Sequence, residues 1–142
     1  SQDRTLDYVF SWDKLLAMQG NTAPYLQYAV ARIRSIFRKL GLEARAPEGP
    51  ARPPETDAER TLARKLCFFP LALEQTAKEL KPHFLCTYLF ELATEFSSFY
   101  NQDKVMVEDS LAQNLRLTLC SSTLHSLSRG LELLGIETLE EM

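Results

Sequence analysis

The residues best suited to chemistry gather on one short stretch of the chain. Residues 21–45 contain five basic side chains and one acidic one, a local charge of +4 in a chain of net charge -3. Tyr25, Tyr28 and Arg32 follow one another at three- and four-residue spacing, which places them on overlapping faces of a helix. Tyrosine rings can stack on bases and arginines can hold phosphates, a combination used to recognise single-stranded RNA. This stretch is therefore the first candidate for a binding site.

The same side chains also fit a purely structural role. Both tyrosine rings could lie in a hydrophobic core with their hydroxyls at its rim, while the arginines keep the outer face of the helix soluble. On spacing alone, this structural role is the better fit. The overall balance of 16 Lys and Arg against 19 Asp and Glu does not indicate a general surface for nucleic acid or membrane.

Other candidate sites are weak. His83 and Cys86 are three residues apart and could share a helix face, but two ligands do not make a metal site, and no further metal-binding spacing occurs. The four-residue spacing of Glu91 and Glu95 is that of a solvated helix face. The sequence has no nucleophile motif and no glycine-rich phosphate loop. We therefore expect no catalytic residue, no metal and no cofactor in this chain.

The pattern of apolar residues predicts an all-α fold. Leucines and alanines recur at three- and four-residue spacing, while valines and isoleucines are few. Asn21 or Thr22 is the expected cap of a long helix that Gly41 ends, and Thr56 has capping-box spacing to Glu59. The expected helices cover about 12–18, 22–40, 56–69, 71–80, 82–100 and 110–128.

These helices are expected to form one bundle of about five or six helices over residues 21–142. The helix over 82–100 should be the central core element, because its apolar stripe is wide: Leu85, Leu89, Leu92, Phe96 and Phe99. In the last helix the residues expected to face inward are Leu111, Leu115, Leu119, Leu127 and Leu131. Residues 42–57 hold four of the seven prolines, which predicts an exposed loop without structure of its own.

The composition also indicates where the protein works. Three widely separated cysteines and the lack of a signal-peptide pattern predict a chain without disulfides in a reducing compartment, the cytoplasm. No apolar run has the length needed to cross a membrane. We expect a soluble monomer. The chain begins at Ser1 in a stretch patterned like the inside of a domain, which predicts a piece of a longer protein.

Three blocks of the sequence resemble one enzyme family. Residues 7–39 are similar to the segment that opens the helical anticodon-binding domain of arginyl-tRNA synthetases: DYVFSWDKLLAMQGNTAPYLQYAVARIRSIFRK. Two later blocks resemble the remainder of that domain: KPHFLCTYLFELATEFSSFY and RLTLCSSTLHSLSRGLELLGIETLEEM. The resemblance covers nearly the whole chain except the proline-rich loop.

This resemblance implies a tRNA-binding module of the class I enzyme that joins arginine to its tRNA. The active site, with ATP and Mg, would belong to a separate catalytic domain, and residues 1–20 would form the seam to it. The expected partners are arginine tRNA and that catalytic domain. The residues that the resemblance places around the anticodon loop are Tyr25, Tyr28, Arg32, Tyr100 and Met142.

Two positions depart from the family's pattern. Glu141 precedes Met142 where members commonly have arginine, and the Cys-Pro pair that often follows the tyrosine matching Tyr100 is absent. On sequence alone, the C-terminal methionine could instead be a frayed end. The alternative function is a helical protein-interaction module without RNA binding, whose partner surface would be Tyr8, Phe10, Trp12 and Leu16.

Overall fold

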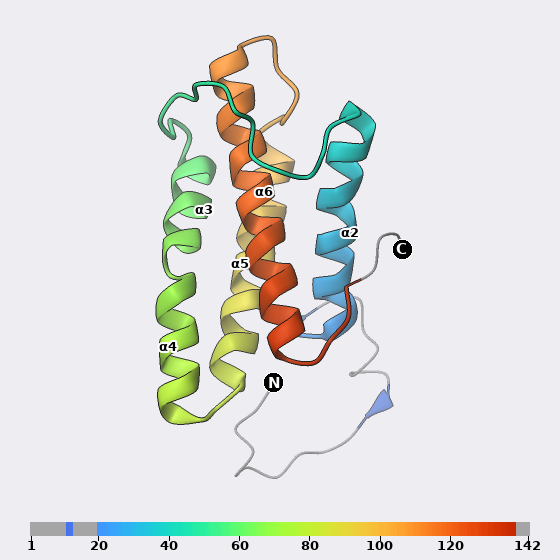
Figure 1. The fold of residues 1–142 in the computed structure, drawn as a ribbon, viewed down its shortest axis with the longest axis vertical. Helices are drawn as coiled ribbons and strands as arrows, with labels where there is room; N and C mark the ends of the chain where they lie inside the picture. Colours follow the sequence, from blue (N-terminus) through green and yellow to red (C-terminus); the bar gives the residue numbers. More distant parts are fainter. Residues whose placement is uncertain (1–10, 13–19, 139–142) are drawn as a thin grey trace.

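The computed structural model describes residues 11–12 and 20–138. This part of the chain forms an all-helical bundle, which confirms the predicted fold class. Its helices are α2 (Ala23–Leu40), α3 (Asp57–Cys67), α4 (Phe69–Glu79), α5 (His83–Gln102) and α6 (Ser110–Leu133). Because α3 and α4 follow each other end to end, these five helices make up four columns of an elongated bundle (Figure 1). Apart from Trp12, the short helix expected over 12–18 lies outside the described residues.

Local sequence signals set the helix ends. The Thr22 side chain caps α2 by accepting a hydrogen bond from a backbone N–H, and Pro24 lies in the first turn, where its missing N–H is not needed. The helix ends at Gly41, whose φ of 64° suits glycine. Pro70 in the first turn of α4 has no N–H to donate to the preceding turn, so α3 and α4 are not one continuous helix.

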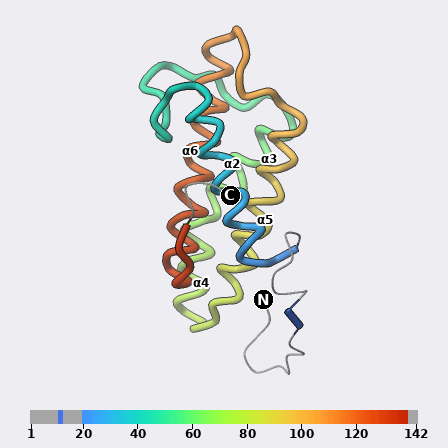
Figure 2. Tube along the Cα trace, turned by 90° about the vertical axis from the view of Figure 1, so that its right-hand side faces the viewer, coloured from blue at the N-terminus to red at the C-terminus, as the bar shows by residue number. Residues whose placement is uncertain are grey.

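The central helix is α5, as predicted. Each of its five predicted core residues is at most 2% exposed: Leu85, Leu89, Leu92, Phe96 and Phe99. It packs against α2, α3, α4 and α6, whereas α2 packs against α5 and α6 (Figures 1 and 2). The position of α2 relative to the C-terminal end of α5 is therefore fixed by the core. Within residues 20–138, no helix combines the length and the apolar character that crossing a membrane requires.

The last helix is longer than predicted. It continues past Ser128 to Leu133, with Gly130 inside it. A Cβ atom on this glycine would lie 2.5 Å from Cδ2 of Leu89, which is fully buried on α5. Gly130 therefore serves the close approach of two helices and does not mark the end of α6.

Leu111 corrects a further detail of the predicted core. It is 42% exposed, whereas the other four leucines predicted to face inward are buried. A helical turn holds 3.6 residues, so every four-residue step moves a side chain roughly 40° further around the axis. The run of leucines therefore drifts around α6, and in the first turn Ala112 takes the inward position instead of Leu111.

The loop between α2 and α3 contains no helix, but it is tied to the bundle rather than unstructured. Asn114 on α6 donates a hydrogen bond to the carbonyl of Pro50 (2.8 Å), and the backbone N–H of Arg52 donates to the carbonyl of Leu111 (3.3 Å). The guanidinium of Arg52 then reaches into the protein, where its side chain is only 12% exposed. The second half of the loop is thus a fixed part of the fold.

The partner of Arg52 is the buried carboxylate of Glu59 at the start of α3. Glu59 accepts two hydrogen bonds from Arg52, both 2.9 Å long, and one of 2.8 Å from Nε of Arg116 on α6. It also accepts one from the backbone N–H of Thr56 (3.2 Å), while Thr56 Oγ1 accepts one from the N–H of Glu59 (3.0 Å). This confirms the capping box predicted from the spacing of these two residues.

The same group of side chains holds the end of α5. Arg116 donates to the backbone carbonyl of Lys104 (2.5 Å) and Thr56 Oγ1 donates to the carboxylate of Asp103 (2.7 Å). Burial by itself raises the pKa of Glu59, but the hydrogen bonds from Arg52, Arg116 and the backbone outweigh it and lower the pKa to about 2. The carboxylate is therefore charged in the folded protein at neutral pH, and its charge is compensated by two arginines.

We expect Glu59→Gln to lower the free energy of unfolding at pH 7 by about 3–5 kcal/mol, because two arginines would lose their buried charged partner. Urea unfolding followed by circular dichroism measures this change. Glu55→Gln is the matched control: that side chain is 66% exposed, so the loss should be below about 1 kcal/mol. Equal stability of the Glu59 variant and the unmodified chain would contradict the role assigned to this carboxylate.

The difference in unfolding free energy between the unmodified chain and Glu59→Gln should also depend on pH. The pKa of Glu59 is about 2 in the folded protein against an ordinary value of 4.5, so its contribution to stability is complete above pH 4.5 and is lost as the pH falls toward 2. The Glu59→Gln variant lacks this contribution at every pH. The difference in unfolding free energy between the two proteins should therefore shrink from pH 4.5 to pH 2, and a constant difference would argue against the lowered pKa.

Gly130→Ala should destabilise the bundle, because the added methyl group overpacks the contact with Leu89 at a cost of about 1–3 kcal/mol. Alanine gains roughly 1 kcal/mol over glycine in a helix, so the net loss should be up to about 2 kcal/mol. Chemical denaturation of Gly130→Ala, Leu89→Ala and the double variant tests the cause. In the Leu89→Ala background the added methyl group has room, so Gly130→Ala should be harmless or stabilising there. A stabilising effect in the unmodified background would contradict the proposed close contact.

Candidate nucleic-acid interface

A basic and aromatic pocket of about 350 Å³ lies between α2 and the C-terminal end of α5. We call it the α2–α5 pocket. It is lined by Tyr28, Ala31, Arg32, Ser35, Ile36, Arg38, Lys39 and Tyr100. These described lining residues include three cations and no carboxylate, although the chain as a whole is acidic. A pocket with this balance of charges favours an anionic ligand.

Arg32 lies between two tyrosine rings in this pocket. Its Cζ atom is 5.4 Å from the ring centroid of Tyr28 and 4.9 Å from that of Tyr100, both within the range of cation–π contacts. Tyr28 precedes Arg32 by one helical turn on α2, whereas Tyr100 comes from α5. The fold therefore brings together three of the five residues predicted to contact RNA.

The ring of Tyr100 is fixed by the hydrophobic core. It stacks on Phe96, with the ring centroids 6.0 Å apart and the ring planes at 29°, and Phe96 is fully buried. Tyr100 is accordingly half-buried, while Tyr28 is 41% exposed. The pocket thus offers one aromatic ring held in place by the core and one more accessible ring, with a guanidinium between them. Flat bases and phosphates are the groups that such an arrangement can bind.

The other two predicted residues do not line this pocket. The ring of Tyr25 lies 5.7 Å from that of Phe90 and is partly buried against the hydrophobic core. Tyr25 therefore packs on the hydrophobic core, the structural role considered for both tyrosines of α2, whereas Tyr28 does not. Met142 lies outside the described residues.

Ser35 and Arg38 line the pocket but were not among the predicted site residues. A signal for Ser35 exists in the sequence, because positions 28, 32, 35 and 39 follow one another at four-, three- and four-residue steps and so share one helix face. Arg38 lies off that face, and its place at the pocket depends on the packing of α2. Arg38 and Lys39 are also in the last turn of α2, where cations interact favourably with the helix dipole.

The two residues considered as metal ligands have ordinary surroundings. His83 packs against the ring of Phe84, with the centroids 4.3 Å apart, and Cys86 is half-buried. Over residues 11–12 and 20–138, His, Cys, Asp and Glu side chains nowhere form a group of three that could hold a metal ion.

Comparison with known proteins gives a consistent set of relatives. The family profile described as the DALR anticodon binding domain matches residues 26–142. Over its full length, the chain is 49% identical to part of an arginine–tRNA ligase from Haemophilus ducreyi and 47% identical to part of one from Vibrio parahaemolyticus. It spans only 25% of the length of either relative.

Two solved structures that the chain resembles are arginyl-tRNA synthetases. The arginyl-tRNA synthetase of Plasmodium falciparum matches 99% of the chain with a TM-score of 0.88 and 33% identity, and the match covers 25% of that protein. The Thermus thermophilus arginyl-tRNA synthetase matches 89% of the chain with a TM-score of 0.80 and 37% identity, covering 22% of that protein.

Proposed function

This chain belongs to the DALR anticodon-binding domain family, and from that premise we propose that it is the anticodon-binding module of an arginine–tRNA ligase. The observation that carries the proposal is the α2–α5 pocket, in which Arg32 lies between Tyr28 and Tyr100 within a basic lining. The ligase reaction, which joins arginine to its tRNA with ATP, belongs to the part of such an enzyme that lies outside this chain.

In the proposed complex, a base of the anticodon loop stacks on the aromatic surface of the pocket. Loop bases are unpaired and can be turned outward onto tyrosine rings, whereas bases in an RNA helix cannot. The base would replace the guanidinium of Arg32 on the ring of Tyr100, and Arg32 would then pair with a phosphate. Arg38 and Lys39 at the same pocket would contact the neighbouring phosphates.

Two residues have a less direct role in this proposal. Tyr25 lies one turn before Tyr28 on α2. RNA that continues from the pocket toward the N-terminus of α2 would meet Tyr25 outside the pocket. Met142 would add a flexible apolar side chain at the edge of the site, since methionine adapts its shape to flat aromatic groups. Neither residue is needed for the arrangement around Arg32.

ATP and Mg do not fit the residues of this module. The chain contains five glycines and no glycine-rich phosphate loop, and the described residues offer no group of metal ligands. We therefore assign no catalytic step to this chain.

We propose that this chain acts in the cytoplasm as a monomer joined to the catalytic domain through residues 1–20. Trp12, which is 65% exposed, belongs to this seam. The three free cysteines of the chain suit a reducing compartment.

Titration with RNA tests the proposed function. Arginine tRNA and the same tRNA with a changed central anticodon base are each titrated into the chain at one stated low salt concentration. We expect the native anticodon to bind about fivefold to a hundredfold more tightly, because a wrong base typically costs on the order of 1–3 kcal/mol where bases are read directly. Equal affinity for both RNAs would reduce the proposal to a phosphate-binding module. Lack of binding to either would favour the protein-interaction module, for which exposed Trp12 is a candidate contact.

Tyr100→Leu should weaken binding of arginine tRNA by about fivefold to a hundredfold, because loss of a stacked base costs roughly 1–3 kcal/mol. Leucine keeps an apolar contact with Phe96, so the thermal midpoint should change little. Tyr25→Leu is the matched comparison: its ring packs on Phe90 away from the pocket, so its effect on affinity should be smaller. If Tyr25→Leu had the larger effect, or if Tyr100→Leu left the affinity unchanged, the pocket would not be the base-binding site.

A further inference from the structure

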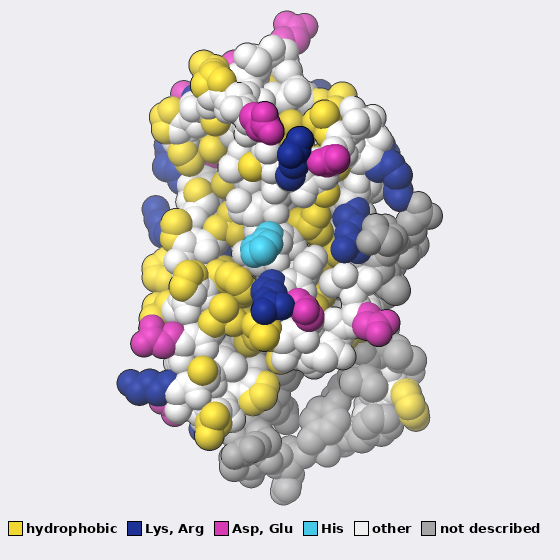
Figure 3. Space-filling model, in the orientation of Figure 1, with side chains coloured by type: hydrophobic (Ala, Val, Ile, Leu, Met, Phe, Trp, Pro, Cys, Tyr) yellow, Lys and Arg dark blue, Asp and Glu magenta, His cyan; other side chains and the backbone are white. Residues whose placement is uncertain are grey.

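A nearly buried carboxylate lies close to the candidate RNA site. Over the face of the bundle that Figure 3 shows, acidic and basic side chains are interspersed at the surface. Asp103 differs from such surface residues, because its side chain is only 11% exposed. It comes directly after α5 and three residues after Tyr100, which lines the α2–α5 pocket. A carboxylate so close to a site for an anion opposes binding through its charge, so its place there needs another reason.

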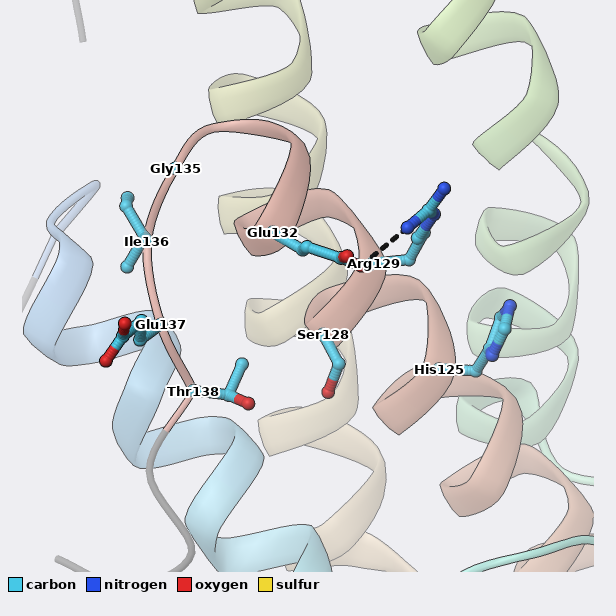
Figure 4. Close-up of a pocket in the computed structure, with 8 residues that line it drawn as sticks. All are labelled: His125, Ser128, Arg129, Glu132, Gly135, Ile136, Glu137 and Thr138. Atoms are coloured by element: carbon cyan, nitrogen blue, oxygen red, sulfur yellow. Dashed lines mark hydrogen bonds and ion pairs between the residues drawn. The ribbon is translucent and has the colours of Figure 1, made fainter.

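The C-terminal end of α5 lacks the local signals that end the other described helices. Both α2 and α6 end in a turn with a glycine at positive φ, Gly41 at 64° and Gly135 at 74° (Figure 4). Basic side chains lie in the last turns of α3 and α4, where they interact favourably with the helix dipole. The last turn of α5, residues 99–102, has no basic side chain, and the acidic Asp103 follows it. The local sequence would therefore leave this turn prone to fraying.

Contacts with two other helices hold this end instead. One oxygen of the Asp103 carboxylate accepts a hydrogen bond from Oγ1 of Thr56, the N-cap of α3 (2.7 Å), and the other accepts one from Nη2 of Arg116 on α6 (3.4 Å). The backbone N–H of Asp103 donates to the carbonyl of Phe99 (2.8 Å), which closes the last turn of α5. We call Thr56, Asp103 and Arg116 the α5 clamp. Because Thr56 and Arg116 are both bonded to Glu59, the clamp is anchored in the buried charge network of the bundle.

The ring of Tyr100 lies between the hydrophobic core and the α5 clamp. Phe96, Tyr100 and Asp103 follow one another at steps of four and three residues, so they share one side of α5. Buried Phe96 supports the ring from the preceding turn, while Asp103 fixes the backbone that follows it. The ring also contacts Arg32, and in the proposed complex a base replaces this contact. The ring must then keep its place through Phe96 and the clamp.

We propose that Asp103 is a positioning residue for RNA binding: with Thr56 and Arg116 it holds the last turn of α5, so that the ring of Tyr100 keeps its place when a base stacks on it. This inference rests on the proposed RNA-binding function. Asp103 is not among the described residues that line the pocket, so it acts through Tyr100. A ring that is ordered before binding loses less freedom in the complex, which strengthens binding.

Charge and positioning predict opposite effects for the loss of this carboxylate. RNA is an anion, so removal of a negative charge close to its site would strengthen binding if charge alone acted. Loss of the clamp lets the last turn of α5 fray, so the ring of Tyr100 would have to be ordered again when a base stacks on it, and binding would weaken. The sign of the change in affinity therefore distinguishes the two.

Binding of the anticodon stem-loop of arginine tRNA to the 142-residue chain tests this role. The variants are Asp103→Ala, Tyr100→Leu and the two combined, each measured at a temperature at which circular dichroism shows it folded. Asp103→Ala should weaken binding roughly twofold to tenfold, the cost of ordering one side chain at an interface. The double variant should bind as Tyr100→Leu does, since Asp103 acts through that ring. Asp103→Asn keeps an oxygen for Thr56 and should restore part of the affinity.

Hydrogen exchange tests the clamp without RNA. In Asp103→Ala the backbone N–H groups of residues 100–103 should exchange faster than in the unmodified chain, because the last turn of α5 opens more often. The N–H of Cys86 donates to the carbonyl of Pro82 (3.1 Å) at the other end of α5. It is the internal control and should exchange at an unchanged rate. Unchanged exchange of residues 100–103 would overturn the inference.

A control variant separates this role from charge. Glu108→Ala removes the same charge from an exposed position between α5 and α6, and it should bind the stem-loop at least as tightly as the unmodified chain. If Asp103→Ala is unfolded at the assay temperature, Asp103→Ser takes its place. Unchanged or tighter binding by the Asp103 variant would overturn the inference, as would multiplying effects in the double variant. Failure of the unmodified chain to bind the stem-loop would reject the proposed function itself, and the inference with it.

Discussion

A single buried carboxylate determines how the parts of this bundle meet. Glu59 is completely enclosed, and a charge in such a place is tolerated only if partners replace the water that it has lost. Those partners come from three places in the sequence: Arg52 in the loop, the backbone at the start of α3, and Arg116 on α6. Loss of any one of these partners would leave a buried charge or polar group uncompensated. The loop, α3 and α6 therefore have one mutual arrangement.

That arrangement extends to the candidate binding site through α5. Arg116 and Thr56 also bond to residues 103 and 104, directly after α5, while the last turn of this helix presents Tyr100 to α2. The core fixes the rest of α5, so its end cannot shift independently. The aromatic and basic groups around Arg32 belong to two helices, and neither helix alone would assemble them. The geometry of the pocket is thus a property of the packed bundle.

The sequence predicts those features that depend on local spacing. The capping box of Thr56 and Glu59 and the apolar stripe of α5 follow from residues within one or a few helical turns, and both are present. Pairings between distant residues leave no such pattern: the meeting of Arg32 with Tyr100, and of Glu59 with two arginines, depends on packing across the bundle. Leu111 and Tyr25 show the same limit, because periodicity gives a face but not which neighbour covers it.

The attachment of Arg52 divides the proline-rich loop into two parts with different tolerance to change in length. Residues 42–48 are mostly exposed, and their ion pairs, Arg45 with Glu43 and Glu48, are local. An insertion there would lengthen a surface loop at little entropic cost. Residues 49–56 are held at Asn114, Leu111 and Glu59, so a single added residue would move Arg52 out of register with its partner. Length variation between related domains should therefore concentrate before Gly49.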